Sequence, residues 1–482
     1  MRTKYILSID QGTTSSRIVV LDEKSHLVEL VSHEFDQIYQ DDAVLQDAEM
    51  IYQGVVGLLN KVIEKYKKEN IVSIGITNQR ETTVCFRKNG TPITHAISWQ
   101  SKHTKEICDT WKSLGYEPLI KKITGLQLNP YFSASKMRYF LDMERVKPYL
   151  LNKDALFGTM DTYLLYRLTE SKSFYTDMSN ASRTMLYDIH QLEYSEKLLD
   201  LFDIPLEMLP EVKPNQFLFG HYQGIPITAM IGDQQSALFG HLAFQKGSMK
   251  VTYGTGAFIL MNTGNKAFIS NKGLISTIAF SYNNEITYAI EGSIFVAGAS
   301  VKWLRDQLEI IKSSAESEGL ALKSQKRMYF VPAFVGLGAP YWDTDVRGAM
   351  FGITQDVNKC DIAKATLDAI AFQVKDVVDV MITETEIPLE EVHIDGGVSD
   401  NGYLMQYQSD LLRCPLIKPK DTEMTALGVG FLAGLGTLYP SVDYIRGQQS
   451  IFKTYQPKMK YKDAINDYEG WKKAVLSAQT YK

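Results

Sequence analysis

Apolar and polar positions alternate through the first part of the chain in a way that predicts three strands, a helix and a further strand. The strands are expected at 4–9, 17–22 and about 27–35. Between 47 and 67 the apolar positions recur at helical spacing, and Asp47 is the expected N-cap of this helix. The apolar run 71–76 then predicts a buried strand. The expected order is therefore β-β-β-α-β.

The second half begins with a similar pattern. Strands are expected at 248–252 and 257–261, joined by the turn Tyr253-Gly254-Thr255-Gly256. Further along, a helix over about 361–382, headed by Asp361, precedes a strand at 392–395. Each half thus has a hairpin with a Gly/Thr turn and, later, a helix followed by a strand. This order predicts a duplicated α/β unit whose boundary lies between 240 and 248.

Length and composition narrow the class of protein. The chain has 482 residues, about three times the size of a typical domain, so two large domains are expected. The net charge of −5 argues against nucleic acid or an anionic membrane as the main partner. No signal peptide is visible, and the longest apolar stretch, 426–439, is too short to span a bilayer and is expected to be a buried helix. The cysteines lie far apart without a C-x-x-C pair, which favours a reduced, cytoplasmic protein without structural zinc: Cys85, Cys108, Cys360 and Cys414.

Two turns rich in Gly and Thr are candidates for phosphate binding. The first is Asp10-Gln11-Gly12-Thr13-Thr14-Ser15, and the second is the turn at 253–256. Each alone is more typical of an ordinary hairpin, because Gly permits positive φ and small polar side chains satisfy turn amides. Two such turns in a duplicated chain favour a pair that clamps a polyphosphate. Neither half contains a P-loop motif or a G-x-G-x-x-G after a strand, so these classes of nucleotide site are not predicted.

Three carboxylates stand where predicted strands end. Asp10 closes an apolar strand, where a carboxylate is costly unless it is paired or binds a metal such as Mg²⁺. Asp233 follows the strand 227–232 and precedes a helix, so it is either an N-cap or a general base for a substrate hydroxyl. Asp395 precedes two glycines and a helical pattern, which fits a plain connection or an anion site.

Arg80 and Glu81 follow the strand 71–76 and combine a donor fork with an acceptor carboxylate, which suits a substrate rich in hydroxyl groups. Adjacent residues of a strand point to opposite faces, so both reach one ligand only if the backbone is irregular there. The alternative is a surface ion pair of little energetic value. Trp99 and Phe258, near polar turns, are candidates for the apolar wall of such a site, and their alternative is an ordinary core position.

Taken together, these segments resemble the FGGY carbohydrate kinases from Ile6 to about Leu438. The resemblance is carried, in order, by SIDQGTTSSR, GITNQRETT, NPYFSASK, NASRTML, IGDQQSALFG, TYGTGAFILMNTG, FVPAFVGLGAPYWD, RGAMFGIT and IDGG. It implies an α/β protein with two actin-like ATPase (RNase H-like) domains and an active-site cleft between them. The domains are expected at 1–244, with the polyol site and the first phosphate turn, and at 245–482, with most nucleotide contacts.

The resemblance is closest to members that act on glycerol, and it implies ATP-dependent phosphorylation of glycerol to sn-glycerol 3-phosphate with Mg²⁺. It also implies a cytoplasmic homo-oligomer, either a dimer or a tetramer. The family's catalytic base falls on Asp233. Its polyol contacts fall on Arg80, Glu81, Tyr131, Asp233 and Gln234, with Trp99 and Phe258 as apolar walls. Its nucleotide contacts fall on Thr13, Thr14, Ser15, Arg17, Thr255, Gly298, Lys302, Gly397 and Asp400, and its metal site falls near Asp10.

Some positions depart from the family pattern. Lys302 stands where Gln is common and Asp400 where Asn is common, so altered contacts to the adenine are expected. Between Gly220 and Ile225 the chain lacks the Gly- and Arg-bearing loop with which some relatives bind a sugar bisphosphate, so no inhibition by such a compound is predicted.

Two other functions remain compatible with the sequence. One is a kinase for another small polyol or sugar, such as dihydroxyacetone or a tetritol. The other is a non-catalytic actin-like protein that assembles with a nucleotide, which would have the phosphate turns but no use for Arg80 and Glu81 beside Asp233.

Overall fold

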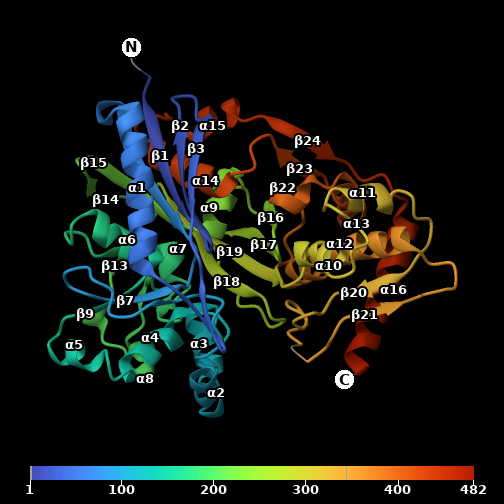
Figure 1. Ribbon diagram of the computed structural model, residues 1–482, viewed down its shortest axis with the longest axis horizontal. Helices are drawn as coiled ribbons and strands as arrows, with labels where there is room; N and C mark the ends of the chain where they lie inside the picture. Colours follow the sequence, from blue (N-terminus) through green and yellow to red (C-terminus); the bar gives the residue numbers. More distant parts are fainter. Residues whose placement is uncertain (1–2, 344, 482) are drawn as a thin grey trace.

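A computed structural model describes residues 3–343 and 345–481, and within them two large mixed sheets dominate the architecture (Figure 1). The first sheet has the order β14-β15-β6-β1-β2-β3, formed by β1 (Tyr5–Gln11), β2 (Ser15–Leu21), β3 (Leu27–Glu34), β6 (Ile71–Asn78), β14 (Gln216–Tyr222) and β15 (Ile225–Gly232). The second has the order β18-β19-β17-β16-β22-β23-β24, formed by β16 (Met249–Tyr253), β17 (Ala257–Gly264), β18 (Ile275–Tyr282), β19 (Glu285–Ile294), β22 (Val392–Asp395), β23 (Leu416–Pro419) and β24 (Ile451–Tyr455).

The two sheets repeat one pairing scheme. Strand β1 is antiparallel to β2 and parallel to β6, just as β16 is antiparallel to β17 and parallel to β22. The outer strands repeat as well. Strand β3 is antiparallel to β2 as β19 is to β17. On the other side, β15 is parallel to β6 and antiparallel to β14, just as β23 is parallel to β22 and antiparallel to β24. Strand β18 is an addition at one edge of the second sheet. The predicted duplication of an α/β unit is thereby confirmed.

The long helix of each unit precedes its central parallel strand. Helix α1 (Ala48–Tyr66) begins as predicted, because the Asp47 side chain accepts the N–H of Met50, and its buried face packs on the first sheet. Helix α12 (Lys359–Thr385) was expected to be headed by Asp361, but its N-cap is Asn358. Asp361 instead accepts the N–H of Asn358, which completes a capping box.

The predicted β-β-β-α-β order is wrong in one detail. Two short strands, β4 (Ile38–Gln40) and β5 (Ala43–Gln46), lie between β3 and α1. They join a smaller sheet with β7 (Thr83–Arg87), β8 (Ala96–Ile97) and β9 (Ala155–Thr159). Both are mostly exposed or half-buried, so they lack the apolar pattern that marks the other strands.

Helices α9 (Asp233–Gly240) and α14 (Met424–Gly434) pack against each other between the two sheets. Helix α14 confirms the buried helix expected in the stretch 426–439, and it also contacts β1, β6 and β15. A segment late in the chain therefore covers the first sheet. The division of the chain at residues 244 and 245 stays a prediction.

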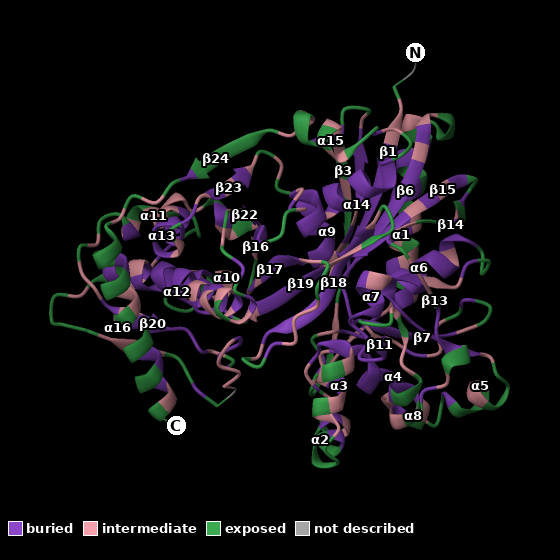
Figure 2. Ribbon diagram, turned by 180° about the vertical axis from the view of Figure 1, so that it is seen from behind, coloured by how far each residue is buried: buried purple, intermediate pink, exposed green. Residues whose placement is uncertain are grey.

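The remaining elements surround this frame. Helices α2 (Lys105–Ser113), α3 (Glu117–Thr124), α4 (Ser133–Asp142), α5 (Lys147–Leu151) and α8 (Glu196–Phe202) gather at the lower left of Figure 1. The inner strands of the two large sheets, α9, α14 and the middle of α12 are buried, whereas the edge strands β3 and β24, helix α2 and much of α16 (Tyr461–Thr480) are exposed (Figure 2). Across residues 3–343 and 345–481, we find no helix with the length and apolarity that crossing a membrane requires.

The smaller elements are α6 (Met160–Leu168), α7 (Met178–Ala181), α10 (Gly298–Asp306), α11 (Glu316–Ala321), α13 (Gly402–Leu412), α15 (Val442–Gln448), β10 (Tyr175–Asp177), β11 (Tyr187–Asp188), β12 (Glu193–Tyr194), β13 (Glu211–Lys213), β20 (Tyr329–Val331), β21 (Ala349–Phe351), and the short 3₁₀ turns η1 (Lys68–Asn70), η2 (Leu206–Met208) and η3 (Gly397–Asp400).

Candidate active site

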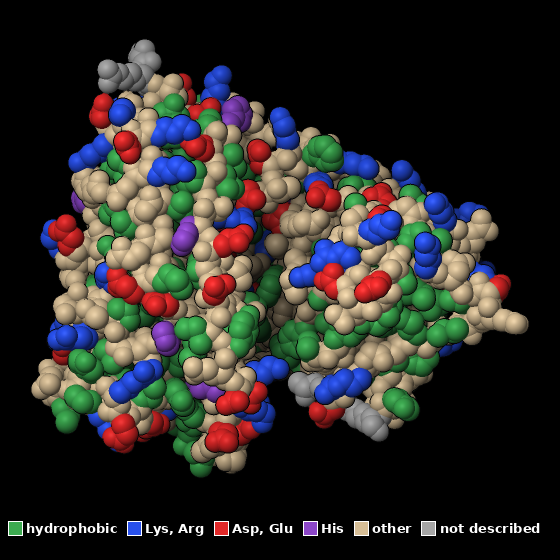
Figure 3. All heavy atoms as spheres, in the orientation of Figure 1, with side chains coloured by type: hydrophobic (Ala, Val, Ile, Leu, Met, Phe, Trp, Pro, Cys, Tyr) green, Lys and Arg blue, Asp and Glu red, His purple; other side chains and the backbone are tan. Residues whose placement is uncertain are grey.

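The surface of the molecule is hollowed between its two halves (Figure 3). A pocket of about 350 Å³ lies where strand ends of both sheets meet the start of α14. Residues of both halves line it: Asp10, Arg17, Thr252, Asp395, Gly396, Gly397, Asp400 and 422–425. Strand ends that face a helix N-terminus favour an anionic ligand.

The first Gly/Thr turn joins β1 to β2 as a hairpin, as its local sequence predicts. Strands β1 and β2 pair up to Gln11 and Ser16, and the Gly12 N–H donates to the Ser15 carbonyl at 2.9 Å. The Thr13 hydroxyl accepts the indole N–H of Trp99 at 3.0 Å. The hairpin is thereby attached to the aromatic part of the site.

The second turn is held by the start of α10. The Gly254 carbonyl accepts the N–H of Gly298, and the Thr255 carbonyl accepts the N–H of Ala297 and of Ala299, all at 2.9 to 3.0 Å. A Cβ atom on Gly298 would lie 2.6 Å from the Gly254 carbonyl oxygen, so only glycine permits this approach. Two of the predicted nucleotide residues, Thr255 and Gly298, are brought together here.

Three of the predicted nucleotide residues line the pocket, namely Arg17, Gly397 and Asp400, whereas six do not: Thr13, Thr14, Ser15, Thr255, Gly298 and Lys302. Gly397 begins η3, and a Cβ atom there would meet no described atom within 4 Å. Asp400 ends η3 and forms an ion pair with Lys418, while Arg17 Nη1 donates to Glu423 Oε2 at 2.6 Å. Lys302 lies on the exposed face of α10, outside the lining of the pocket.

Asp10 is a buried carboxylate at the end of β1. Burial raises its pKa to about 7, against the opposing effect of Arg17, and the negative charges of Asp233 and Glu423 raise it further. A cation bound at this point would favour the ionised carboxylate. In the described part of the chain, no cluster of three or more metal-ligating side chains forms a complete metal site.

The backbone after β6 is irregular, which was the condition for Arg80 and Glu81 to face one region. Strand β6 ends at Asn78, and Glu81 has a φ of +61°. Both side chains are buried, so the alternative of a surface ion pair is wrong. Arg80 Nε lies 3.2 Å from Asp233 Oδ1 and 4.0 Å from Glu81 Oε1. The predicted base and the predicted polyol residues therefore lie side by side.

Asp233 is the first residue of α9, and the N-cap is Gly232 rather than Asp233. Its Oδ1 accepts the N–H of Gln234 at 2.7 Å as well as contacting Arg80. The side chain of Gln234 accepts a hydrogen bond from Lys250, a buried lysine of β16. Desolvation lowers the pKa of Lys250 to about 8, although Asp395, Asp233 and Glu291 oppose this.

Sequence analysis missed two buried charges that complete this cluster, Glu291 of β19 and Arg183 after α7. Glu291 accepts from Arg80 Nη1 at 2.6 Å and from Arg80 Nη2 at 3.0 Å. Arg183 donates to Glu81 at 2.5 Å and to Glu291 at 3.2 Å. Burial alone would raise the pKa of Glu291, but Arg183 and Arg80 lower it to about 2. A signal for Glu291 existed, because it interrupts the apolar run of β19 as Asp10 interrupts β1.

Three aromatic side chains adjoin the charged cluster. The ring of Trp99 makes edge-to-face contacts with Tyr131 and with Phe258, at centroid distances of 5.5 and 6.5 Å. All three are half-buried rather than core residues, and Phe258 comes from the second half. The structure thus brings together the three predicted aromatic residues.

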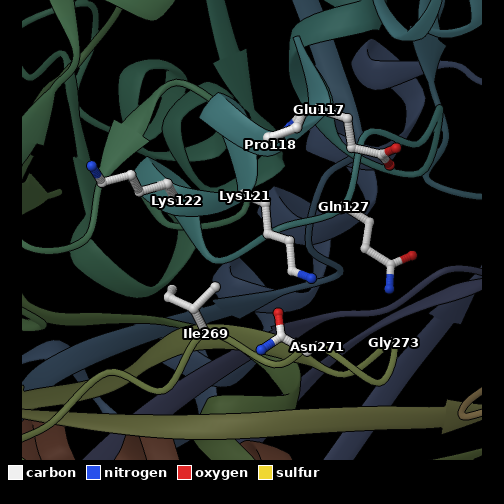
Figure 4. A pocket seen from close by; sticks show the side chains of 8 residues that line it. All are labelled: Glu117, Pro118, Lys121, Lys122, Gln127, Ile269, Asn271 and Gly273. Atoms are coloured by element: carbon white, nitrogen blue, oxygen red, sulfur yellow. The ribbon is translucent and has the colours of Figure 1, made fainter. Parts of the chain in front are cut away.

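A second hollow, of about 640 Å³, lies between α3 and the loop 269–273 (Figure 4). It is lined by Glu117, Pro118, Lys121, Lys122, Gln127, Ile269, Asn271 and Gly273. None of the predicted site residues belongs to it, so we place the chemistry in the first pocket and the adjoining charged cluster.

Comparison with known families agrees with this geometry. The N-terminal domain of the FGGY family of carbohydrate kinases matches residues 5–240, and its C-terminal domain matches residues 249–437. The chain belongs to the FGGY family of carbohydrate kinases. The predicted family and the predicted two-domain, actin-like ATPase fold are confirmed.

Individual relatives of this FGGY kinase are similar over their full length. It is 46% identical to a glycerol kinase of Lactococcus lactis, covering 100% of this chain and 99% of the relative. It is 45% identical to a glycerol kinase of Geobacillus kaustophilus, covering 99% and 100%. Among solved structures, Plasmodium falciparum glycerol kinase with ADP matches with a TM-score of 0.94 and 34% identity, covering 99% of this chain and 98% of the other.

Proposed function

We propose that this FGGY kinase transfers the γ-phosphoryl group of ATP to glycerol and forms sn-glycerol 3-phosphate. The observation that carries the proposal is the identity of 44% to 46% with glycerol kinases over essentially the whole chain. The ADP-bound relative, at 34% identity, supports ATP as the phosphoryl donor. The clustered charges beside the phosphate turns give this activity a physical basis.

Asp233 is the general base in this proposal. Its Oδ1 already accepts the backbone N–H of Gln234 and forms an ion pair with Arg80 Nε at 3.2 Å, so we assign Oδ2 to the proton of the substrate hydroxyl. As that proton leaves, the oxygen attacks the γ-phosphorus in line, and ADP departs on the opposite side. Positioning and charge neutralisation then supply most of the catalysis, as is typical of phosphoryl transfer.

The polyol site combines Glu81, Arg80, Tyr131 and Gln234 with the apolar walls Trp99 and Phe258. Arg80 contributes less to the polyol than its donor fork suggests. Its two Nη1 hydrogens serve Glu291 and Gln235, and Nη2 gives one hydrogen to Glu291. At most one N–H of Nη2 is left for a hydroxyl group.

The nucleotide site consists of the two turns and the pocket between them. We assign five residues to the phosphates: Thr13, Thr14, Ser15, Arg17 and Thr255. We assign four more to the rest of the nucleotide: Gly298, Lys302, Gly397 and Asp400. Asp10 fits a Mg²⁺ ion, because it is a buried oxygen ligand at the pocket whose ionised form a cation would favour. When bound, Mg²⁺ supplies neutralisation of the phosphate charge.

A cytoplasmic location and a dimeric or tetrameric state are also part of the proposal. They are supported by the family membership and by four cysteines that are all free thiols. Crosslinking or light scattering of the purified chain measures the oligomeric state directly.

The decisive experiment is a coupled ADP-release assay across glycerol, dihydroxyacetone, the tetritols and a set of sugars. We expect glycerol to give the highest kcat/KM. A clear preference for another polyol would replace glycerol as the substrate. ATP-dependent sedimentation without polyol-dependent ADP release would instead favour a nucleotide-dependent assembly protein.

A further inference from the structure

Arg183 contacts two of the residues assigned to the polyol. It follows α7, and its side chain is fully buried. Its Nε donates to Glu81 Oε1 at 2.5 Å. Its guanidinium also lies over the ring of Tyr131, 5.7 Å from the centroid, and over that of Phe132 at 5.2 Å. One side chain thus holds a carboxylate and an aromatic ring of the proposed site.

A second carboxylate partner of Arg183, besides Glu81, comes from the other half of the molecule. Glu291 of β19 accepts from Arg183 Nη2 at 3.2 Å and from both terminal nitrogens of Arg80. It is the carboxylate shared between the two arginines. Its position ties the side chains around Glu81 to the second sheet.

One atom of Arg183 has unused hydrogen-bonding capacity. Within the described residues, Nη1 has no hydrogen-bond partner, although it is shielded from solvent. Buried donors are normally paired, because an unpaired one costs free energy. A hydroxyl oxygen of a ligand bound against Glu81 is an acceptor of the kind that this atom lacks.

We propose that Arg183 is a positioning residue for the polyol, which holds the Glu81 carboxylate and the Tyr131 ring in place, with Glu291 as the shared counter-ion. The inference rests on the proposed function, since it takes Glu81 and Tyr131 as polyol contacts. A lysine cannot replace this arginine fully, because an ammonium group does not offer a planar fork to two carboxylates.

The arrangement has a pH signature that a purely structural arginine would lack. The charged and titratable groups that face Glu81 are Arg183, Arg80, Glu291, Tyr131 and Lys136. Burial raises the pKa of Glu81, and Arg183 is the strongest opposing influence. Without Arg183 that pKa rises further, so a larger fraction of Glu81 is protonated at a given pH, and a protonated carboxyl group is no longer a pure acceptor. Raising the pH ionises it again.

The test compares Arg183→Met, Arg183→Lys and the wild type in steady-state kinetics with glycerol and with ATP. For Arg183→Met we expect the KM for glycerol to rise about 10- to 100-fold, with the KM for ATP within about twofold of the wild type. The KM for glycerol should fall more steeply with rising pH in this variant than in the wild type, because the pKa of Glu81 is higher in the variant. Arg183→Lys should raise the KM for glycerol several-fold without the added pH dependence.

Arg327→Met is the matched control. Arg327 also contacts two carboxylates, Asp368 and Asp467, and lies over a tyrosine ring, but it lies outside the proposed site. We expect it to change the melting temperature and to leave the KM for glycerol unaltered.

An unchanged KM for glycerol in either Arg183 variant overturns the inference, as does a rise that is equal for ATP and independent of pH. If Arg183→Met does not fold, Arg183→Lys decides, because it keeps the charge. The assay of the wild type distinguishes a failure of this inference from a failure of the proposed function. Without glycerol-dependent ADP release in the wild type, the proposed function itself fails, whereas an active wild type with unaffected variants removes only the role of Arg183.

Discussion

At the scale of single residues, the site is a chain of alternating charges. Asp233 contacts Arg80, Arg80 contacts Glu291, Glu291 contacts Arg183, and Arg183 contacts Glu81. Four of these five side chains are almost completely buried, and Asp233 is the more exposed end of the chain. Removing one member leaves a buried charge without its partner, which typically costs about 3–5 kcal/mol.

Replacing Asp233 with Asn tests the general base. The amide keeps the shape of the side chain but cannot take up the hydroxyl proton. We expect kcat to fall by about 10²- to 10⁴-fold with little change in glycerol binding. Asp361→Asn, at the start of α12 and away from the pocket, serves as the control. An Asp233→Asn variant that keeps more than a tenth of the wild-type kcat would rule out Asp233 as the base.

Lys136 gives a prediction for stability. It is fully buried, and its Nζ donates to the carbonyls of Pro130, Tyr131 and Phe132. Desolvation lowers its pKa to about 7, against the attraction of Glu81. Between this value and the ordinary lysine pKa of about 10.4, the unfolded chain binds a proton that the folded chain has released, so rising pH stabilises the fold.

The change to test is Lys136→Met, which should remove the contribution of Lys136 to the pH dependence of stability. We expect the slope of the unfolding free energy against pH to be lower by about 1.4 kcal/mol per pH unit between about pH 7 and about pH 10. Chemical denaturation at several pH values measures it. Lys112→Met, an exposed position on α2, should keep the wild-type slope. Equal slopes in the wild type and Lys136→Met would show that Lys136 stays charged.

At the scale of elements, the close packing of α9 and α14 holds the halves together. A Cβ atom on Gly428 would lie 1.9 Å from the carbonyl oxygen of Ser236, and one on Gly240 would lie 2.3 Å from that of Met424. Both obstacles are backbone atoms, which side-chain rotation cannot relieve. The two glycines therefore set the distance between the helices.

Gly428→Ala should consequently destabilise the protein by about 1–3 kcal/mol or more, because the helices must move apart. Gly57→Ala is the matched control in α1, where a Cβ atom meets no described atom within 4 Å. That variant should gain about 0.5–1 kcal/mol from better helix propensity. Thermal unfolding compares the two, and a neutral Gly428→Ala would contradict the rigid contact.

Gly397→Ala tests the element that borders the proposed nucleotide pocket. The added methyl group meets no described atom within 4 Å, so the melting temperature should stay the same. If the nucleotide passes here, the KM for ATP should rise several-fold while the KM for glycerol stays constant. Gly396→Ala should instead destabilise the fold, because Gly396 has a φ of +83° and a Cβ atom would lie 2.4 Å from the Tyr253 carbonyl oxygen. An unchanged KM for ATP in Gly397→Ala would remove Gly397 from the site.

At the scale of the whole molecule, duplication creates the site. The two units present their Gly/Thr turns, at 12–15 and 253–256, near the boundary between the halves. Contacts across that boundary connect Arg17 with Glu423 and Arg80 with Glu291. A change in the relative position of the halves would therefore alter both the proposed nucleotide site and the proposed polyol site.

The edge of the first sheet leads to a prediction about regulation. Strands β14 and β15 are joined only by Gln223 and Gly224, whose φ values are +50° and +80°. This tight hairpin lies where the sequence predicts the absence of a Gly- and Arg-bearing loop for a sugar bisphosphate. We expect fructose 1,6-bisphosphate to leave the activity unchanged in the coupled assay. Inhibition at sub-millimolar concentrations would contradict this.

By itself, the sequence determined the main elements and several chemical groups of the site. Hydrophobic spacing and capping are local properties, so the helix after Asp47, the buried helix within 426–439 and the hairpin at 10–15 were predictable. A carboxylate at the end of an apolar strand is also a local feature, so Asp10 and Asp233 were predictable as candidate site residues. Short strands such as β4 and β5 were not predicted, because three or four half-exposed residues show no clear alternation of apolar and polar positions.

Only the tertiary structure decided which charges meet. Arg80 and Glu291 are 211 positions apart, and Arg183 and Glu81 are 102 apart. No local pattern relates such residues, since their contact depends on how the two sheets pack around α9 and α14. The fold turned the expected donor fork of Arg80 toward Glu291 and placed Arg183 against Glu81 and Tyr131. The sequence alone thus determined the residue types available to the site, and packing determined their partners.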